Sequence, residues 1–283
     1  MRDPRNPFQL RKSEVIDSDS AFLNLFEPGM LDILPAQDWY GNVRPIRSAA
    51  GGGKTSMLRL FTPDILHLLH QRQSEPAVKD LFARVEELGA IHAESGPRVL
   101  GVMLSCGRNY SHLQDLGVDQ TRRDRLFFSL LNVRIILAAL RAAISFAGLR
   151  YPDDLNQLEF ADLPESKTVP GLPLPCTGET LREWAASTEE QICAALDSFR
   201  PIEEQQIPGH DSLVSLWLVQ PDVIRINGEP IVDGTLVMMD DIHQLSAAQR
   251  RTLLDTVTEL RSRVGIWIAE RLEALSADEL LSS

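Results

Sequence analysis

The chain has 283 residues, 43% of them hydrophobic, so it can bury a substantial core and is not disordered throughout. A formal net charge of −12 argues against a protein whose main surface binds nucleic acid by charge alone, although a local basic face stays open. Cys106, Cys176 and Cys193 are odd in number and widely separated. Neither a disulfide framework nor a zinc site is therefore favoured, and the reducing cytoplasm fits best.

The sequence also argues against a membrane protein. Its first residues are polar, include prolines and lack the apolar centre of a signal peptide. The most apolar helical stretch, 127–149, contains Arg134 and Arg141, and each arginine would cost about 2.5–3.5 kcal/mol at the centre of a bilayer. We therefore predict a buried core helix here and no contact with a membrane.

Residues 1–40 are predicted to form an extended arm followed by two short helical pieces, 21–26 and 30–34, separated by Pro28-Gly29. A segment placed just before the first strand can cover an adenine ring. It can equally well do no more than pack on the sheet, and the sequence leaves both alternatives open.

The stretch VRPIRSAAGGGKTSMLRL, residues 43–60, has the layout of a phosphate-binding loop. Small residues run from Ser48 to Gly53, and a helical pattern follows them. Such a loop lets backbone N–H groups surround an anion, and the positive end of the helix adds to the attraction. Lys54 would reach the β- and γ-phosphates, and the Thr55 hydroxyl would hold a Mg²⁺ ion. The candidate nucleotide-binding residues are Ala50, Gly51, Gly52, Gly53, Lys54, Thr55 and Ser56.

Two features of this stretch depart from the usual pattern. The motif G-x-x-x-x-G-K-[ST] has glycine six positions before the lysine, where this chain has Ser48. Pro45 lies inside the expected strand, and because proline lacks the N–H donor it belongs on an edge strand or at a strand start. A glycine-rich linker that precedes Lys-Thr by chance and binds nothing is the alternative interpretation.

The middle of the chain reads mostly as helix. The run RVLGVML, 98–104, predicts a buried parallel strand, and Asn227-Gly228 predicts the tight turn of a hairpin over 224–231. LVSLWLV, 213–219, also reads as a strand. Helices are predicted at 55–61, 64–72, 76–88, 119–148 and 177–200, with irregular, proline-containing connections at 150–176 and 201–212.

A second motif follows at residues 235–241, where the apolar run TLVMM ends in Asp240-Asp241 before a helix at 247–260. A strand that delivers two carboxylates to its end is typical of a Walker B segment. Asp240 would orient Mg²⁺ opposite the Thr55 hydroxyl, and Asp241 would polarise the attacking water. Asp-Asp before a helix is also a common capping arrangement, which is the alternative.

The segment DDIHQLSAAQRRTLLDTVTELRSRVGIWIAER, residues 240–271, resembles the Walker B strand, helix and sensor strand of AAA+ and STAND-type P-loop ATPases, including their origin-recognition-like branch. The resemblance covers about residues 40–70 and 233–272. It implies ATP with Mg²⁺ as the ligand, and it makes Arg271 a candidate sensor of the γ-phosphate. Asp241 stands where many of these enzymes have Glu, and its shorter side chain favours slow turnover or nucleotide holding.

We therefore expect an α/β protein with the three-layer P-loop NTPase fold, in which a mainly parallel central sheet carries a large, mostly helical insertion. The expected parts are an N-terminal arm with short helices, 1–40; the core, 41–106 and 213–283; and the insertion, 107–212. The family also has a fifth strand and a helical lid, which we expect to be missing before Ser283. Without strand five the loop-bearing strand would be an edge strand, where Pro45 is tolerated.

The resemblance implies a cytoplasmic, Mg-dependent ATPase with catalytic roles for Lys54 and Asp241, which couples its nucleotide state to a conformational change. The implied partner is another protein or a downstream effector region, and a second copy of the chain is an alternative. ATP rather than GTP is expected, because no guanine-reading N-K-x-D motif is present. A nucleotide-binding switch or scaffold with little turnover and a DNA-associated ATPase subunit are the rival functions.

Overall fold

A four-stranded parallel sheet lies at the centre of the computed structural model, which describes residues 18–35, 43–197, 209–210, 212–260 and 263–271. The strands run across the sheet in the order β1-β10-β9-β4. They are β1 (Val43–Ser48), β10 (Gly265–Arg271), β9 (Gly234–Asp240) and β4 (Val99–Ser105). β9 and most of β10 are buried, as expected for parallel strands that have helices on both faces.

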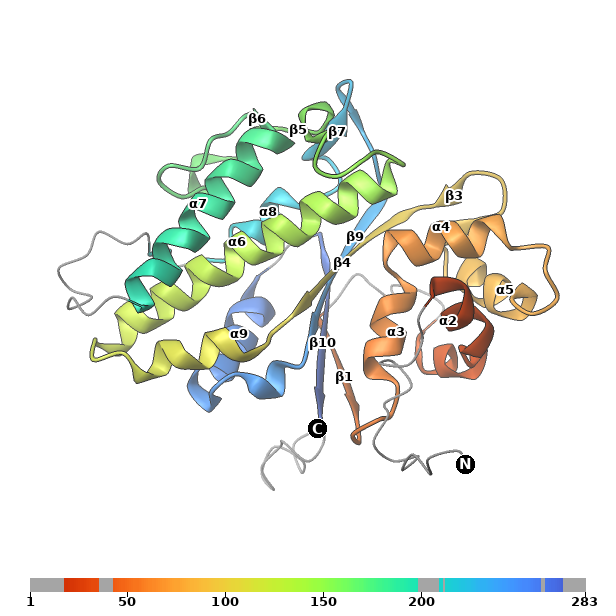
Figure 1. Cartoon of the computed structure of the whole chain (residues 1–283), viewed down its shortest axis with the longest axis horizontal. Helices are drawn as coiled ribbons and strands as arrows, with labels where there is room; N and C mark the ends of the chain where they lie inside the picture. The colour runs from red at the N-terminus through yellow and green to blue at the C-terminus, as the bar shows by residue number, and fades with distance from the viewer. Residues whose placement is uncertain (1–17, 36–42, 198–208, 211, 261–262, 272–283) are drawn as a thin grey trace, which may run out of the picture.

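One face of the sheet is covered by the helices that precede β4 in the chain (Figure 1). Side chains from alternate strand positions, including Met238 and Trp267, point to this face, and the ring of Trp267 lies edge-on to Phe61 with centroids 5.2 Å apart. A short hairpin, β2 (Ile91–His92) and β3 (Gly96–Pro97), precedes β4. The helices are α2 (Asp19–Leu25), η1 (Pro28–Ile33), α3 (Lys54–Leu60), α4 (Pro63–Gln71) and α5 (Lys79–Glu87).

The other face is covered by helices that follow β4 in the chain. Val237 and Ile268 of the sheet belong to the same buried cluster as Leu130 and Leu140 of α6, so α6 packs directly on the sheet. The described residues of the segment 107–212, which was predicted as a mostly helical insertion, thus supply part of a core layer. The helices on this face are η2 (Arg108–Asp115), α6 (Gln120–Phe146), α7 (Gly178–Leu196), α8 (Ser215–Leu218) and α9 (Ala247–Glu259).

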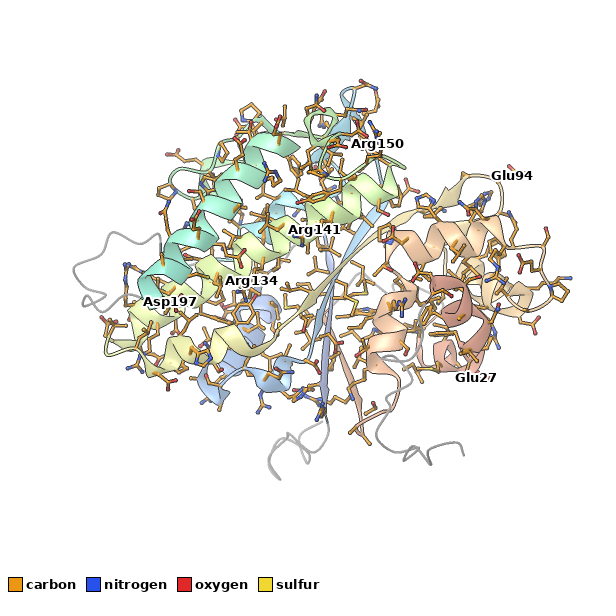
Figure 2. The ribbon with its side chains drawn as sticks, viewed as in Figure 1. Glu27, Glu94, Arg134, Arg141, Arg150 and Asp197 are labelled. Atoms are coloured by element: carbon orange, nitrogen blue, oxygen red, sulfur yellow. The ribbon has the colours of Figure 1, made fainter. Side chains whose placement is uncertain are left out.

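Helix α6 is the one helix, within the described part of the chain, that is long and apolar enough to cross a membrane. Its most apolar window has a mean hydropathy of 1.8, yet 72% of that window is buried inside the protein. Arg134 lies on α6 (Figure 2). Its Nε pairs with Oε1 of Glu189 on α7 at 2.7 Å. The high hydropathy is therefore that of a buried core helix, and the arginine on it is paired with a carboxylate.

A small antiparallel sheet with the order β6-β5-β7-β8 lies at one end of α6 and α7. Its hairpin confirms the predicted turn, because Asn227 and Gly228 both have positive φ, 52° and 79°. The segment 150–176 is less irregular than predicted, since it contributes two short strands and buries Leu155 and Leu158. The elements are η3 (Leu155–Gln157), β5 (Glu159–Phe160), η4 (Glu165–Lys167), β6 (Cys176–Thr177), β7 (Ile224–Ile226) and β8 (Glu229–Pro230).

The strand predicted at 213–219 is wrong, because residues Ser215–Leu218 form the short helix α8. The side-chain amide of Asn132, buried in α6, accepts a hydrogen bond from Ser215 N at 3.0 Å and donates one to Ser212 O at 2.7 Å. These bonds hold the entry of the helix. A short apolar run surrounded by core does not reveal by its periodicity whether it is strand or helix.

The predicted edge position of the first strand is confirmed within the described part of the chain, where β1 pairs with β10 alone. Pro45 is exposed on β1 and lies opposite Ile268 in the parallel register. A missing N–H donor is tolerated at such an edge.

Candidate functional site

The two sequence motifs meet at the carboxyl edge of the parallel sheet. Ser48 at the end of β1 lies opposite Arg271 at the end of β10, and Asp240 ends the neighbouring strand β9. Because the strands are parallel, their carboxyl ends share one edge, and ligands of open α/β sheets bind outside that edge. The glycine-rich loop, which links β1 to α3, lies on the same side.

The glycine-rich loop has a backbone that other residues would not readily adopt. Gly51 and Gly53 have φ of +78° and +81°, in the left-handed region. A Cβ added to Gly52 would lie 2.4 Å from Ser48 Oγ, and one added to Gly53 would lie 2.6 Å from Cε of Met30. The loop is therefore folded closely onto Ser48 and onto η1, which places part of the N-terminal segment beside it.

Lys54, the first residue of α3, turns its ammonium group back into the loop. Its Nζ donates to Ser48 O at 2.8 Å, to Ser48 Oγ at 3.0 Å and to Ala49 O at 3.1 Å. The serine that departs from the usual motif thus supplies one of these oxygens through its side chain. Ala50 is exposed in the loop, and Ser56 is half-buried in the first turn of α3.

Asp240 is the most constrained carboxylate of the site. It is only 4% exposed, and its Oδ2 accepts a hydrogen bond of 2.6 Å from the Thr55 hydroxyl. Its Oδ1 accepts a second bond of 2.8 Å from the N–H of Asp241. Burial raises the pKa of Asp240 and the charge of Asp241 adds to this rise, whereas the two hydrogen bonds and the nearby Lys54 oppose it. The ionised carboxylate is thus costly to hold without a cation.

Asp241 follows β9 in an unusual backbone conformation, with φ of 58°. A non-glycine residue in the left-handed region is uncommon, and such residues concentrate at functional sites. The Asp241 side chain is 30% exposed, and its Oδ1 lies 3.6 Å from Nδ1 of His243 in the short helix η6 (Ile242–Gln244). The sequence did not single out His243. Two residues that are two positions apart, such as Asp241 and His243, can face each other or point apart, depending on the backbone turn between them.

His243 is largely enclosed by this site, with its side chain 12% exposed. Burial lowers the pKa of His243, and the positive charges of Arg271 and Lys54 lower it further, while Asp241 and Asp240 oppose them. The imidazole is therefore neutral near pH 7. Arg271 is close enough to affect His243 electrostatically, and it lies opposite Ser48, so the structure brings the sensor candidate to the loop.

Glu270, the neighbour of Arg271, is a buried carboxylate whose partners the sequence did not predict. Its side chain is 2% exposed, and its Oε1 accepts a hydrogen bond of 2.7 Å from Nε of Arg47 on the edge strand. Arg250 of α9 lies 4.0 Å from its other oxygen. Glu270 therefore links β10 to β1 by a charged hydrogen bond and lies within ion-pair distance of α9. A strand pattern alone does not predict this structural role, because it depends on which strand lies alongside.

Cys106 lies directly after β4, and its N–H donates to Asp240 O at 2.8 Å. The side chain is fully buried. Burial raises the pKa of the Cys106 thiol to about 12, and the charges of Asp240 and Asp241 contribute to the rise. The thiol is therefore protonated at neutral pH and unsuited to nucleophilic chemistry.

The side chains present fit a magnesium ion shared with a ligand better than a metal held by protein alone. No group of three or more His, Cys, Asp or Glu side chains within the described residues is placed to hold a metal ion. Mg²⁺ commonly takes one or two protein ligands and fills its octahedron with water and phosphate oxygens. Thr55 and Asp240, two oxygen donors in contact, meet that requirement. Comparisons of the chain with models of known protein families, with curated proteins and with solved structures found no match.

Proposed function

We propose that the chain binds ATP with Mg²⁺ at the carboxyl edge of its sheet and hydrolyses it, as a P-loop ATPase of the AAA+ or STAND type. The observation that carries the proposal is the 2.6 Å hydrogen bond between Thr55 and Asp240. One residue comes from each motif, and 185 positions separate them. Two motifs that match by chance would have no reason to meet at hydrogen-bond distance.

The residues of the loop have distinct tasks in this proposal. Backbone N–H groups from Ala50 to Thr55 donate to phosphate oxygens, and the ammonium of Lys54 offsets their charge. Thr55 and Asp240 hold the metal ion, which supplies electrostatic stabilisation of the phosphate charge when bound. Arg271, opposite Ser48 in the register, is the proposed γ-phosphate sensor.

Asp241 accepts hydrogen bonds from the attacking water in this proposal, and its side chain is partly open to solvent. Hydrolysis then times a conformational change in a protein partner, and the proposed location is the cytoplasm. Nucleotide holding with little turnover is the second candidate function. The observation that favours it is the set of bonds that Lys54 makes within its own loop, because a ligand must compete with them.

A binding experiment tests the proposal directly. We expect Mg-ATP to raise the melting temperature of the wild type, since ligand at a hundred times its Kd adds about 2.7 kcal/mol to the free energy of unfolding. Lys54→Ala should remove the shift, whereas Lys79→Ala, an exposed lysine on α5, should keep it. An equal absence of shift in all three proteins would overturn the proposal.

A phosphate-release assay separates the ATPase from the nucleotide-holding switch. Wild type that releases phosphate and an Asp241→Asn variant that binds ATP but does not would support hydrolysis. Binding without release in both proteins would favour the switch. Isothermal titration with ATP in the absence of Mg²⁺ is the control for the metal. Thr55 and Asp240 are proposed to act only through Mg²⁺, so they should not contribute to ATP binding in this experiment.

A further inference from the structure

The feature that the proposed function has not used is His243, which lies beside Asp241. The Nδ1 of His243 is 3.6 Å from Oδ1 of Asp241, and no hydrogen-bond partner for this buried nitrogen occurs within the described residues. A separation of 3.6 Å is longer than a hydrogen bond. Catalytic hydrogen bonds are often long without the ligand and tighten when it binds.

The backbone makes the contact between these two side chains specific. The left-handed conformation of Asp241, φ 58°, turns the chain directly after β9, and its N–H is held by Oδ1 of Asp240. The helix η6 begins at Ile242, whose side chain is fully buried. The burial of Ile242 fixes the backbone of the next residue, His243. Asp241 and His243 are thus held on a short, fixed backbone segment rather than on a free loop.

Burial and the surrounding charges together determine which form of the His243 ring meets Asp241. Burial favours the neutral ring most, and Arg271 and Lys54 add to this effect, whereas Asp241 and Asp240 favour the cation. A neutral imidazole has one N–H donor and one acceptor nitrogen, and the partner of one nitrogen selects the tautomer. A carboxylate accepts and does not donate, so Nδ1 carries the proton when it faces Asp241.

We propose that His243 is a positioning residue for Asp241, whose carboxylate it orients by donating its Nδ1–H to Oδ1. This inference rests on the proposed function. The bond leaves Oδ2 of Asp241 as the acceptor for the proton of the attacking water. It also compensates for the short side chain of Asp241, because an oriented carboxylate spends more of its time in the reactive position. His243 itself touches neither the water nor the nucleotide.

The kinetic test uses amides that mimic one ring nitrogen each. The side-chain nitrogen of His243→Asn can occupy the place of Nδ1, whereas that of His243→Gln reaches toward the place of Nε2. We expect His243→Gln and His243→Ala to lower kcat for ATP about tenfold or more, with KM within twofold of the wild type. His243→Asn should retain kcat within about threefold.

Each outcome of the kinetic test has a fixed meaning. A kcat in His243→Gln equal to that of the wild type would overturn the inference, and so would an equal loss in the Asn and Gln variants. A purely structural role would lower the melting temperature in all three variants and would not distinguish Asn from Gln. Wild type without any ATPase activity would overturn the proposed function and this inference together.

A second test needs no nucleotide. Nitrogen NMR of the free protein at pH 7.5 distinguishes the two neutral tautomers of each histidine, and loss of a signal in His243→Asn assigns this one. The inference predicts that Nδ1 of His243 carries the proton in the wild type, and that Asp241→Ala shifts the population toward the Nε2–H form. A proton on Nε2 that ignores the Asp241 substitution would contradict the inference even if ATP is hydrolysed.

Discussion

Charged side chains are exposed at the amino end of the parallel sheet, whereas Asp240 is buried at the carboxyl end. At the amino end, Arg98 pairs with Asp233 at 2.6 Å, and both side chains are about half exposed, at 47% and 62%. Arg263 and Asp222 form a similar exposed pair, and both residues line a cleft that also includes Asp233. At the carboxyl end, Asp240 is 4% exposed, lies in contact with a hydroxyl, and has its pKa raised by burial.

The backbone of one non-glycine residue is strained at the carboxyl end, where Asp241 has positive φ directly after β9, beside the loop of Gly51 and Gly53. Positive φ by itself does not distinguish the two ends, because Gly96 before β4 and Gly228 before β9 have it too. Exposed ion pairs contribute little to stability, typically about 0–1 kcal/mol each. Buried charge and a left-handed aspartate both lower stability, so their presence at a single edge marks where the fold favours chemistry over stability.

The largest effect of a substitution is expected at the carboxyl end of the sheet. We predict that Asp240→Asn lowers Mg-dependent ATP hydrolysis about 100-fold or more, because the amide is a poor magnesium ligand and carries no charge. Asp233→Asn, the matched change at the amino end, should leave the rate unchanged. Phosphate release at saturating Mg-ATP measures both, and similar rates in the two variants would contradict the difference between the ends.

A smaller effect concerns the bond between Ser48 and Lys54. Ser48→Ala removes the hydroxyl that accepts from Lys54 at 3.0 Å and leaves the ammonium freer to meet phosphate. We predict an affinity for Mg-ATP about three- to tenfold higher, which corresponds to one hydrogen bond of about 1 kcal/mol. Ser74→Ala, an exposed serine, is the control. Weaker binding by Ser48→Ala in isothermal titration would show that the hydroxyl contacts the nucleotide instead.

The next prediction concerns stability and pH. Because the pKa of Asp240 is raised in the folded state, its contribution to stability is present at pH below the unfolded value and lost as pH rises through the folded pKa. Asp240→Asn imitates the protonated form at every pH. We expect it to be more stable than wild type by about 1 kcal/mol at pH 7.5 without Mg²⁺. Urea unfolding should show this gain shrinking toward pH 4, and a variant less stable at pH 7.5 would refute it.

The smallest effect is expected at the amino end. Asp233→Asn breaks an exposed pair with Arg98, so the free energy of unfolding should fall by less than about 0.5 kcal/mol. The difference from wild type should decline further in 1 M NaCl, where charges are screened within about 3 Å. A loss above 2 kcal/mol by urea unfolding would mean that the pair is not a simple surface contact.

Local sequence signals predicted much of the architecture. The β4 strand, the α6 helix and the Asn227-Gly228 turn were predictable because each depends on neighbouring residues and on backbone sterics. The helix α8 was not, since the hydrogen bonds that set its entry come from Asn132, far away in the sequence. The role of Glu270 escaped for the same reason, because its partner Arg47 lies on another strand.

Sequence alone determined that a small-residue loop precedes Lys54-Thr55, that an apolar strand ends in Asp240-Asp241, and that the run 98–104 forms a buried parallel strand. These properties follow from residue order, because small side chains, apolar runs and turn residues act over a few positions. Tertiary structure decided that Thr55 donates a hydrogen bond to Asp240 and that Asp241 faces His243. These contacts depend on the order of the strands in the sheet and on the backbone turn after β9. Neither can be read from the types of residues that are far apart in the sequence.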